Sequence, residues 1–93
     1  MSKAKDRIAT ALQYKSEKQV APKVVAKGMG YVADAILTRG QENDVPVYKD
    51  AKLSQQLYNL SIGEEIPEEL YELVAEVLIF IAKLDAGKKN SNG

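Results

Sequence analysis

Near the start of the chain, larger side chains alternate with small or polar ones, and this spacing is typical of a strand. Residues 8–14 keep a period of two throughout, so we predict a first strand there. The face with the larger side chains consists of Ile8, Thr10, Leu12 and Tyr14. A second apolar run, at 24–26, is compatible with helix or strand by periodicity alone, but Pro22 before it and Gly28 after it limit it to strand length.

After Gly28 the spacing of apolar residues becomes helical. Apolar residues recur at i, i+3, i+4, i+7 and i+8 up to about Asn43, which predicts an amphipathic helix. Its stripe consists of Met29, Val32, Ala33, Ile36, Leu37 and Gly40. The run 45–48 (VPVY) then predicts a third, short strand. A strand, helix and strand in this order imply a right-handed crossover between parallel neighbours, and Pro46 favours an edge position.

Two further helices follow. Asp50 is a suitable N-cap for a helix over 51–60, and Pro67 with the two glutamates after it marks the start of a last helix that we expect to end near Leu84. The main stripe of this last helix consists of Leu70, Val74, Val77, Leu78 and Ile81. Leu73, Ile79 and Phe80 lie outside that stripe. Either the core or a partner covers them, and core burial is the more common explanation.

These elements predict a single α+β domain with a small mixed β-sheet of about three strands, surrounded by about three helices. At 93 residues the chain has room for one core of marginal size. We expect residues 1–7 to form a flexible basic tail, residues 8–85 the folded domain, and residues 86–93 a second flexible tail.

Composition excludes most chemistry. The chain contains no cysteine, so it has no thiolate and no disulfide. It also contains no histidine, which is the commonest metal ligand and general base. We therefore expect no enzymatic activity and no cofactor. No segment approaches the roughly 20 apolar residues that span a bilayer, so we expect a cytoplasmic protein without membrane insertion of its own.

Charge is distributed unevenly although the net charge is zero. Residues 1–27 carry a net charge of +5, residues 28–61 carry −1, and residues 62–93 carry −4. Such polarity can steer a partner, but surface charge more often serves solubility alone. Tyr14 is the single aromatic residue in the basic first third, so we expect no nucleic-acid partner.

Two local motifs have a functional and a structural interpretation. Gly28-Met29-Gly30 resembles the start of a dinucleotide-binding turn, but it lacks the third glycine, and a tight strand-to-helix turn is the favoured interpretation. The glutamates of 64–76 could suggest a cation site, but the glycine-punctuated loop of oxygen ligands is missing. We interpret them as a helix start with a solvated face.

Six segments in matching order carry a resemblance to a known family. They are 11–14 (ALQY), 21–28 (APKVVAKG), 45–46 (VP), 57–58 (LY), 62–67 (IGEEIP) and 70–78 (LYELVAEVL). Together they resemble the cytoplasmic C-terminal domain of the FlhB/YscU export-switch proteins of flagellar and virulence type III secretion. The resemblance implies a small sheet surrounded by helices, in agreement with the elements predicted above.

The chain departs from this family at one motif. Family members have Asn-Pro-Thr-His just before the first matching strand, and cyclisation of that asparagine breaks the chain. Here the corresponding residues are Ala4-Lys5-Asp6-Arg7, so we expect no self-cleavage. The protein looks like the free C-terminal fragment, without the membrane-spanning half. The family segment that supplies a strand before the motif is absent, so the resemblance implies an open edge at Ile8, Thr10 and Leu12 that a strand could complete in trans.

The resemblance implies a non-enzymatic adaptor of flagellar or type III protein export. It would stand in for the cleaved domain on the membrane half of an FlhB-type export gate protein, at the inner face of the membrane. Export substrates would contact an apolar patch that consists of Ala21, Pro22, Ala75 and Leu78. Ordinary core packing is the alternative for these four residues. The alternative function is a soluble regulator that binds export substrates or chaperones away from the gate.

Overall fold

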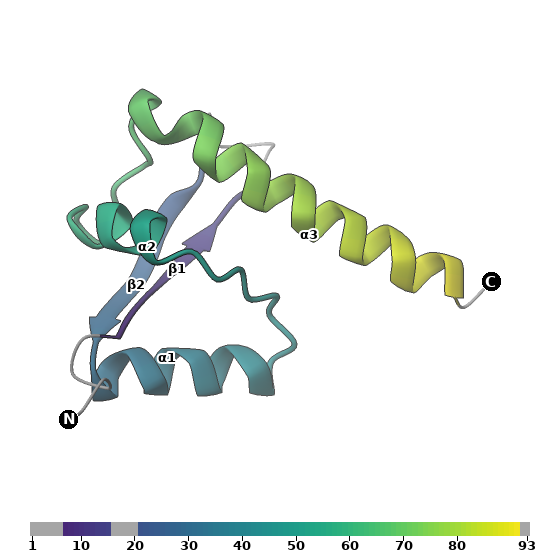
Figure 1. The fold of residues 1–93 in the computed structure, drawn as a ribbon, viewed down its shortest axis with the longest axis horizontal. Helices are drawn as coiled ribbons and strands as arrows, with labels where there is room; N and C mark the ends of the chain where they lie inside the picture. Colours follow the sequence, from purple (N-terminus) through teal and green to yellow (C-terminus); the bar gives the residue numbers. More distant parts are fainter. Residues whose placement is uncertain (1–6, 16–20, 92–93) are drawn as a thin grey trace.

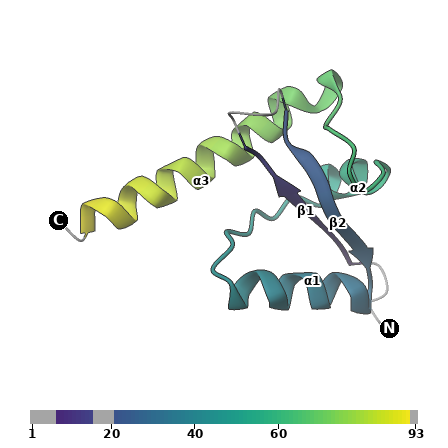
Figure 2. The same ribbon diagram turned by 180° about the vertical axis from the view of Figure 1, so that it is seen from behind.

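The computed structural model describes residues 7–15 and 21–91, and three α-helices surround a two-stranded hairpin (Figures 1 and 2). In chain order the elements are β1 (Ile8–Gln13), β2 (Lys23–Met29), α1 (Tyr31–Glu42), α2 (Ala51–Tyr58), the 3-10 helix η2 (Glu68–Leu70) and α3 (Tyr71–Ser91). The predicted α+β class and the three helices are confirmed.

The two strands form an antiparallel pair. Ile8 pairs with Met29 and Thr10 with Lys27, and the register shifts between Ala11 and Leu12. Beyond this bulge Leu12 pairs with Val24, which is fully buried. Both strands that the alternation and the proline–glycine boundaries predict are therefore present.

The third predicted strand and its parallel crossover are wrong. Residues 45–48 have no regular structure, and the sheet of the described residues contains β1 and β2 only. Asp44 adopts a positive φ of 58°, and the Val45 amide donates to the Gly40 carbonyl at 2.8 Å. Pro46 has no amide proton. Of the two amides that a ladder would need here, that of Val45 is already used and that of Pro46 is missing. The sheet is therefore antiparallel rather than mixed.

Helix α1 lies very close to the hairpin because small residues form the contact. Gly28 is buried, and a Cβ atom added to it would lie 2.2 Å from Val32 Cγ1. Ala9 and Ala33 are also buried. Gly30 is the N-cap of α1 and has a φ of 64°, a value that favours glycine. Gly28-Met29-Gly30 is therefore the tight strand-to-helix turn that was the favoured interpretation.

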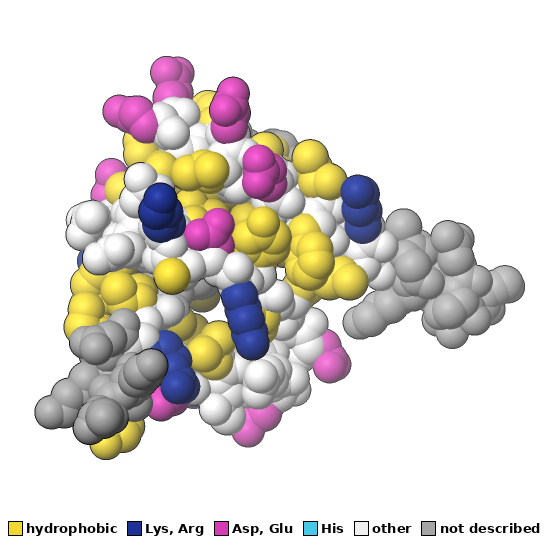
Figure 3. All heavy atoms as spheres, in the orientation of Figure 1, with side chains coloured by type: hydrophobic (Ala, Val, Ile, Leu, Met, Phe, Trp, Pro, Cys, Tyr) yellow, Lys and Arg dark blue, Asp and Glu magenta, His cyan; other side chains and the backbone are white. Residues whose placement is uncertain are grey.

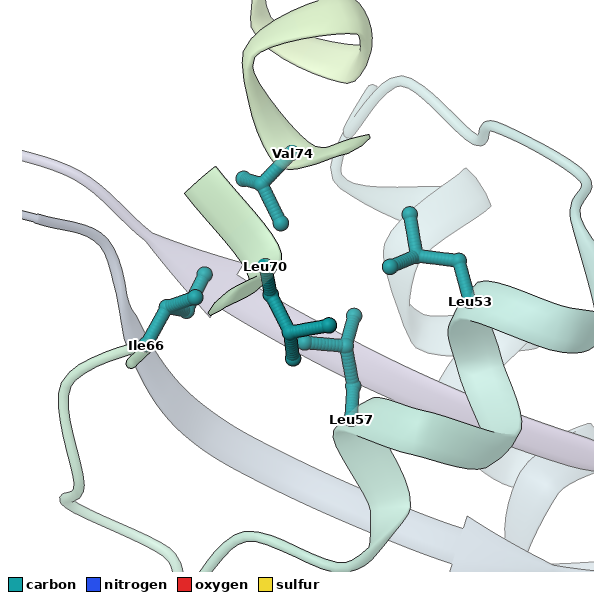
Figure 4. Packing of buried hydrophobic residues seen from close by; sticks show 5 residues of the cluster. All are labelled: Leu53, Leu57, Ile66, Leu70 and Val74. Atoms are coloured by element: carbon teal, nitrogen blue, oxygen red, sulfur yellow. The ribbon is translucent and has the colours of Figure 1, made fainter. Parts of the chain in front are cut away.

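The main hydrophobic cluster lies between α2 and the start of α3 (Figure 4). Its buried members are Leu53, Leu57, Ile66, Leu70 and Val74, and Leu12, Leu60, Val77 and Leu78 pack against it. The predicted N-cap of α2 is confirmed, since the Asp50 carboxylate accepts a hydrogen bond from the Leu53 amide at 3.1 Å.

Lys27 joins the hairpin to the end of α2. Its ammonium donates to the carbonyls of Tyr58 at 3.0 Å and Leu60 at 2.8 Å, and it lies 5.0 Å from the centre of the Tyr58 ring. A cation at this position satisfies carbonyls that have no partner inside the helix and complements the helix dipole.

Helix α3 extends away from the rest of the molecule and gives it a long dimension of 46 Å (Figures 1 and 2). It continues to Ser91, seven residues past the predicted end, so residues 86–91 belong to a helix. Leu73, Ile79 and Phe80 are 40%, 55% and 38% exposed, and the expectation of core burial for them is wrong. The predicted tail residues 1–6 and 92–93, and 16–20 of the strand connection, lie outside the described residues.

Acidic side chains gather around the start of α3, at the top of Figure 3. They are exposed, as expected for the solvated start of a helix. Within the described residues, none of the helices combines the length and the apolar character that crossing a bilayer requires.

Candidate functional site

A shallow apolar hollow of about 200 Å³ lies between the chain around β2 and the first half of α3. Eight residues line it: Tyr14, Ala21, Pro22, Ile66, Tyr71, Val74, Ala75 and Leu78. None of them is charged, and the two tyrosine hydroxyls are the only polar side-chain groups. The hollow therefore suits an apolar side chain better than an ion or a polar metabolite.

Backbone hydrogen bonds between two segments hold the wall of the hollow in place. The amide of Ile66 donates to the Pro22 carbonyl at 2.9 Å, and the amide of Val24 donates to the Glu64 carbonyl at 3.0 Å. Gly63, with a φ of 94°, donates to the Val24 carbonyl at 2.7 Å. Residues 63–66 thus follow the outer side of β2 and bring the start of α3 next to Pro22.

All four residues of the predicted patch line this hollow, but they differ in accessibility. Ala21 is 2% exposed and Pro22 is buried, so these two form the floor and pack as core residues do. Ala75 is exposed and Leu78 is half-buried, so these two form the accessible rim on α3. Ala21 and Pro22 are therefore packed as the core-packing alternative expects, whereas Ala75 and Leu78 are accessible to a partner.

The sequence reasoning missed the other four lining residues. Tyr14 and Tyr71 are 43% and 40% exposed and contribute their rings to the hollow, whereas Ile66 and Val74 are buried in its floor. Tyr71 could have been found, because it precedes Ala75 by one helical turn and shares its face. Tyr14 meets α3 only through the tertiary fold, which no local pattern reports.

The predicted partner edge is the outer side of β1. The Gly30 amide donates to the Arg7 carbonyl at 2.8 Å, and the register continues from this pair into the hairpin. Hydrogen-bonded and non-hydrogen-bonded pairs alternate along an antiparallel ladder. Ile8 and Thr10 are therefore at non-hydrogen-bonded positions, and their amides and carbonyls point away from β2, towards the open side.

The side chains at this edge are partly covered. Ile8, Thr10 and Leu12 are half-buried, and Leu12 packs against the main cluster. Thr10 Oγ1 is buried and has no hydrogen-bond partner within the described part of the chain. A buried hydroxyl without a partner is uncommon in native structures. Among the described residues, the edge thus has unused polar groups in its backbone and in one side chain.

No group of acidic side chains in the described ranges has the arrangement of a metal site. The ion pair between Arg7 and Asp34 links the start of β1 to α1, and both side chains are partly exposed. Such a pair contributes little to stability. The hollow and the β1 edge remain the two candidate sites.

The family model described as "FlhB HrpN YscU SpaS Family" matches residues 6–81. The chain belongs to this family. Protein YlqH of Bacillus subtilis (strain 168) is 44% identical over 84 residues, a match that covers 90% of each chain. The flagellar biosynthetic protein FlhB of Escherichia coli (strain K12) is 48% identical over 77 residues, which cover 82% of this chain and 20% of FlhB.

Solved structures of family domains have the same fold. A crystal structure of a mutated EscU/SpaS C-terminal domain has a TM-score of 0.75 and 32% identity, and covers 78% of this chain and 91% of its own. The native SpaS C-terminal domain has a TM-score of 0.82 and covers 89% of this chain and 97% of its own, with 20% identity, which shows the fold alone. The family resemblance of the sequence motifs is thus confirmed.

Proposed function

We propose that this FlhB-type domain acts in type III protein export as an adaptor, which docks on the membrane part of an FlhB-type export gate protein and contacts export substrates. Family membership supports a role in type III export. The chain spans one fifth of Escherichia coli FlhB, so the docking and the substrate contact belong to the proposal.

The open edge of β1 is the observation that carries the docking step. A strand that joins this edge would find the amides and carbonyls of Ile8 and Thr10 already directed outward. Main-chain hydrogen bonds then supply the affinity, as in other cases of strand addition.

The hollow supports the substrate step. Its floor is well packed because Ala21 and Pro22 are buried and the Pro22 carbonyl accepts a hydrogen bond from the Ile66 amide, and its rim on α3 is accessible. An apolar side chain of an export substrate, inserted beside Ala75 and Leu78, would bury apolar surface at about 25 cal/mol per Å² without desolvating a charge. The hollow and the β1 edge share no residue, so docking and substrate contact are compatible.

A secretion assay in a strain whose FlhB ends after the asparagine of its cleavage motif tests this function. Expression of the present protein should restore export of flagellar proteins into the medium. Loss of export despite good expression of the folded protein would contradict the adaptor function. If overproduction instead lowers export in the wild-type strain, the soluble regulator is the better description.

Matched variants separate the two steps. Thr10→Pro removes an amide that points outward and leaves the hydrogen bonds between β1 and β2 intact, so it should abolish docking, whereas Thr10→Val keeps that amide and should still dock. Ala75→Glu places a charge in the hollow and should reduce export without loss of docking. Ala82→Glu, also exposed on α3 but outside the hollow, is its control.

A further inference from the structure

A second apolar stripe runs along α3 beside the stripe that faces the core, and the two share Val77. It consists of Leu73, Val77, Phe80 and Leu84, whose spacing of four, three and four residues is that of a coiled-coil seam. Leu73, Phe80 and Leu84 are 40%, 38% and 43% exposed, and Val77 is half-buried. In Figure 3 hydrophobic side chains reach the surface along the middle of α3.

This seam and the hollow lie on different sides of the helix. With about 100° of rotation per residue, the four seam residues fall within an arc of roughly 60°, whereas Ala75 lies about 160° from Leu73. Phe80 contacts Tyr48, whose ring is 5.3 Å away in an edge-to-face arrangement, and Tyr48 extends the apolar surface beside the seam. A partner on the seam would leave the hollow open.

The second half of α3 has few contacts with the domain that would stabilise it. Val74 is the last residue of the helix in the main cluster, with Val77 and Leu78 packed against it, and the helix then continues to Ser91. Most helical stability in proteins comes from packing of an apolar face. Several projecting turns with exposed leucine and phenylalanine are therefore typical of a helix that packs on another molecule.

The charges beside the seam are complementary to those of a second copy of the same helix. Glu76 and Lys83 are both exposed, and each directly precedes the first residue of a heptad, Val77 or Leu84. Residues at these flanking positions face their equivalents across an antiparallel pair of helices. In the register that places Val77 opposite Phe80, Glu76 of one copy faces Lys83 of the other, and the reciprocal pair forms by symmetry.

We propose that α3 pairs in antiparallel fashion with α3 of a second copy of this chain. The same register gives four layers: Leu73 opposite Leu84, Val77 opposite Phe80, and the two symmetry equivalents. Two Glu76–Lys83 ion pairs flank these layers. Because the seam spans only about three helical turns, its buried area is below that of a standard stable interface, and the dimer should dissociate in the range of tens of micromolar.

Sedimentation equilibrium on the intact chain, from about 5 to about 500 µM, tests this pairing. The wild-type protein should shift from its monomer mass of 10.2 kDa towards twice that value. Glu76→Lys alone and Lys83→Glu alone should each weaken association about tenfold, because two attractive pairs become repulsive. An equimolar mixture of the two variants should associate as tightly as wild type, since every cross pair is again of opposite charge.

Two substitutions at exposed residues, one in the seam and one outside it, test whether the seam forms the interface. Leu84→Glu should abolish association, whereas Ile79→Glu, at a residue that is 55% exposed and outside the seam, should leave it unchanged. A wild-type protein that stays monomeric throughout the range would overturn the proposal. Association without any response to the charge variants, or without recovery in their mixture, would overturn the register. Neither result bears on the secretion assay, which tests the hollow and the β1 edge.

Discussion

Gly28→Ala is the substitution for which the structure gives the sharpest expectation. The added Cβ atom would lie 2.2 Å from Val32 Cγ1, 2.7 Å from Val32 Cβ and 3.1 Å from the Val32 carbonyl carbon. A valine in a helix has essentially one χ1 rotamer, so the side chain cannot rotate away. The contact with Val32 Cβ would persist in any rotamer. Helix α1 must therefore move away from the hairpin and open the contact at Ala9 and Ala33.

The magnitude follows from two opposing effects. Overpacking of a close contact of this kind lowers the free energy of unfolding by about 1 to 3 kcal/mol. Because Gly28→Ala also disturbs the packing around the buried Ala33, we expect its cost to lie in the upper half of that range. Replacement of glycine by alanine stabilises by about 0.4 to 1 kcal/mol through the unfolded state. The net loss in the free energy of unfolding should be about 2 kcal/mol, which for a chain of this size lowers the Tm by about 8 to 16 °C.

Urea unfolding followed by circular dichroism measures this loss, and Gly40→Ala is the matched control. A Cβ at Gly40 would lie 3.7 Å from its nearest neighbour, Val45 Cβ, so this helical glycine should accept alanine with a gain of about 0.5 to 1 kcal/mol. Val32→Ala in the Gly28→Ala background should recover part of the loss, because it removes the shortest contact. A Gly28→Ala protein within about 0.5 kcal/mol of wild type would refute the close approach of α1.

Three further substitutions test individual contacts by the same unfolding measurement. Lys27→Met keeps the apolar stem but leaves the Tyr58 and Leu60 carbonyls without their cation, and should cost about 2 kcal/mol, whereas a loss below about 0.5 kcal/mol would contradict these bonds. Asp50→Ala should cost about 1 kcal/mol through loss of the N-cap of α2, and Asp50→Asn, which can still accept the hydrogen bond, should retain most of it. Thr10→Val should raise stability by up to about 1 kcal/mol because it removes a buried hydroxyl without a partner in the described ranges, and a clear loss would show that this hydroxyl is satisfied in the isolated protein.

The sequence predicted those elements whose ends are set by interactions between residues close together in the chain. Asp50 caps α2 because its side chain reaches an amide three residues later, and Gly28 and Gly30 end a strand and start a helix because no larger residue fits. The run 45–48 shows where this reasoning ends. Its β-branched residues suit a strand, but the Val45 amide donates to the Gly40 carbonyl and Pro46 has no amide proton, so the run lacks donors for a ladder.

Helix α3 shows a second limit of the sequence. Leu70, Val74, Val77 and Leu78 of its predicted core stripe lie in or against the main cluster. The predicted burial of Leu73 and Phe80 was wrong, because periodicity reports the apolar character of a face and not what covers it. The end of the helix was also missed, since the polar residues after Leu84 lack a periodic signal although α3 continues through them.

The candidate site depended on the family resemblance as much as on the residues. Spacing alone places Ala75 and Leu78 on one helix face, but no local rule brings Pro22 next to that face. The link is the backbone of 63–66, which binds β2 on one side and leads into α3 on the other. Tertiary placement of this kind also explains why Tyr14 was missed, whereas Tyr71 lies one helical turn before Ala75 and could have been found from spacing.

Docking through the β1 edge is the central claim, and a binding titration tests it most directly. The measurement uses a membrane-solubilised FlhB that ends after the asparagine of its cleavage motif, titrated with this protein and with the Thr10→Pro and Thr10→Val variants. The account predicts saturable binding by the wild-type protein and by Thr10→Val, and loss of binding by a folded Thr10→Pro protein. No saturable binding up to about 100 µM, or equal binding by all three proteins, would contradict docking through this edge.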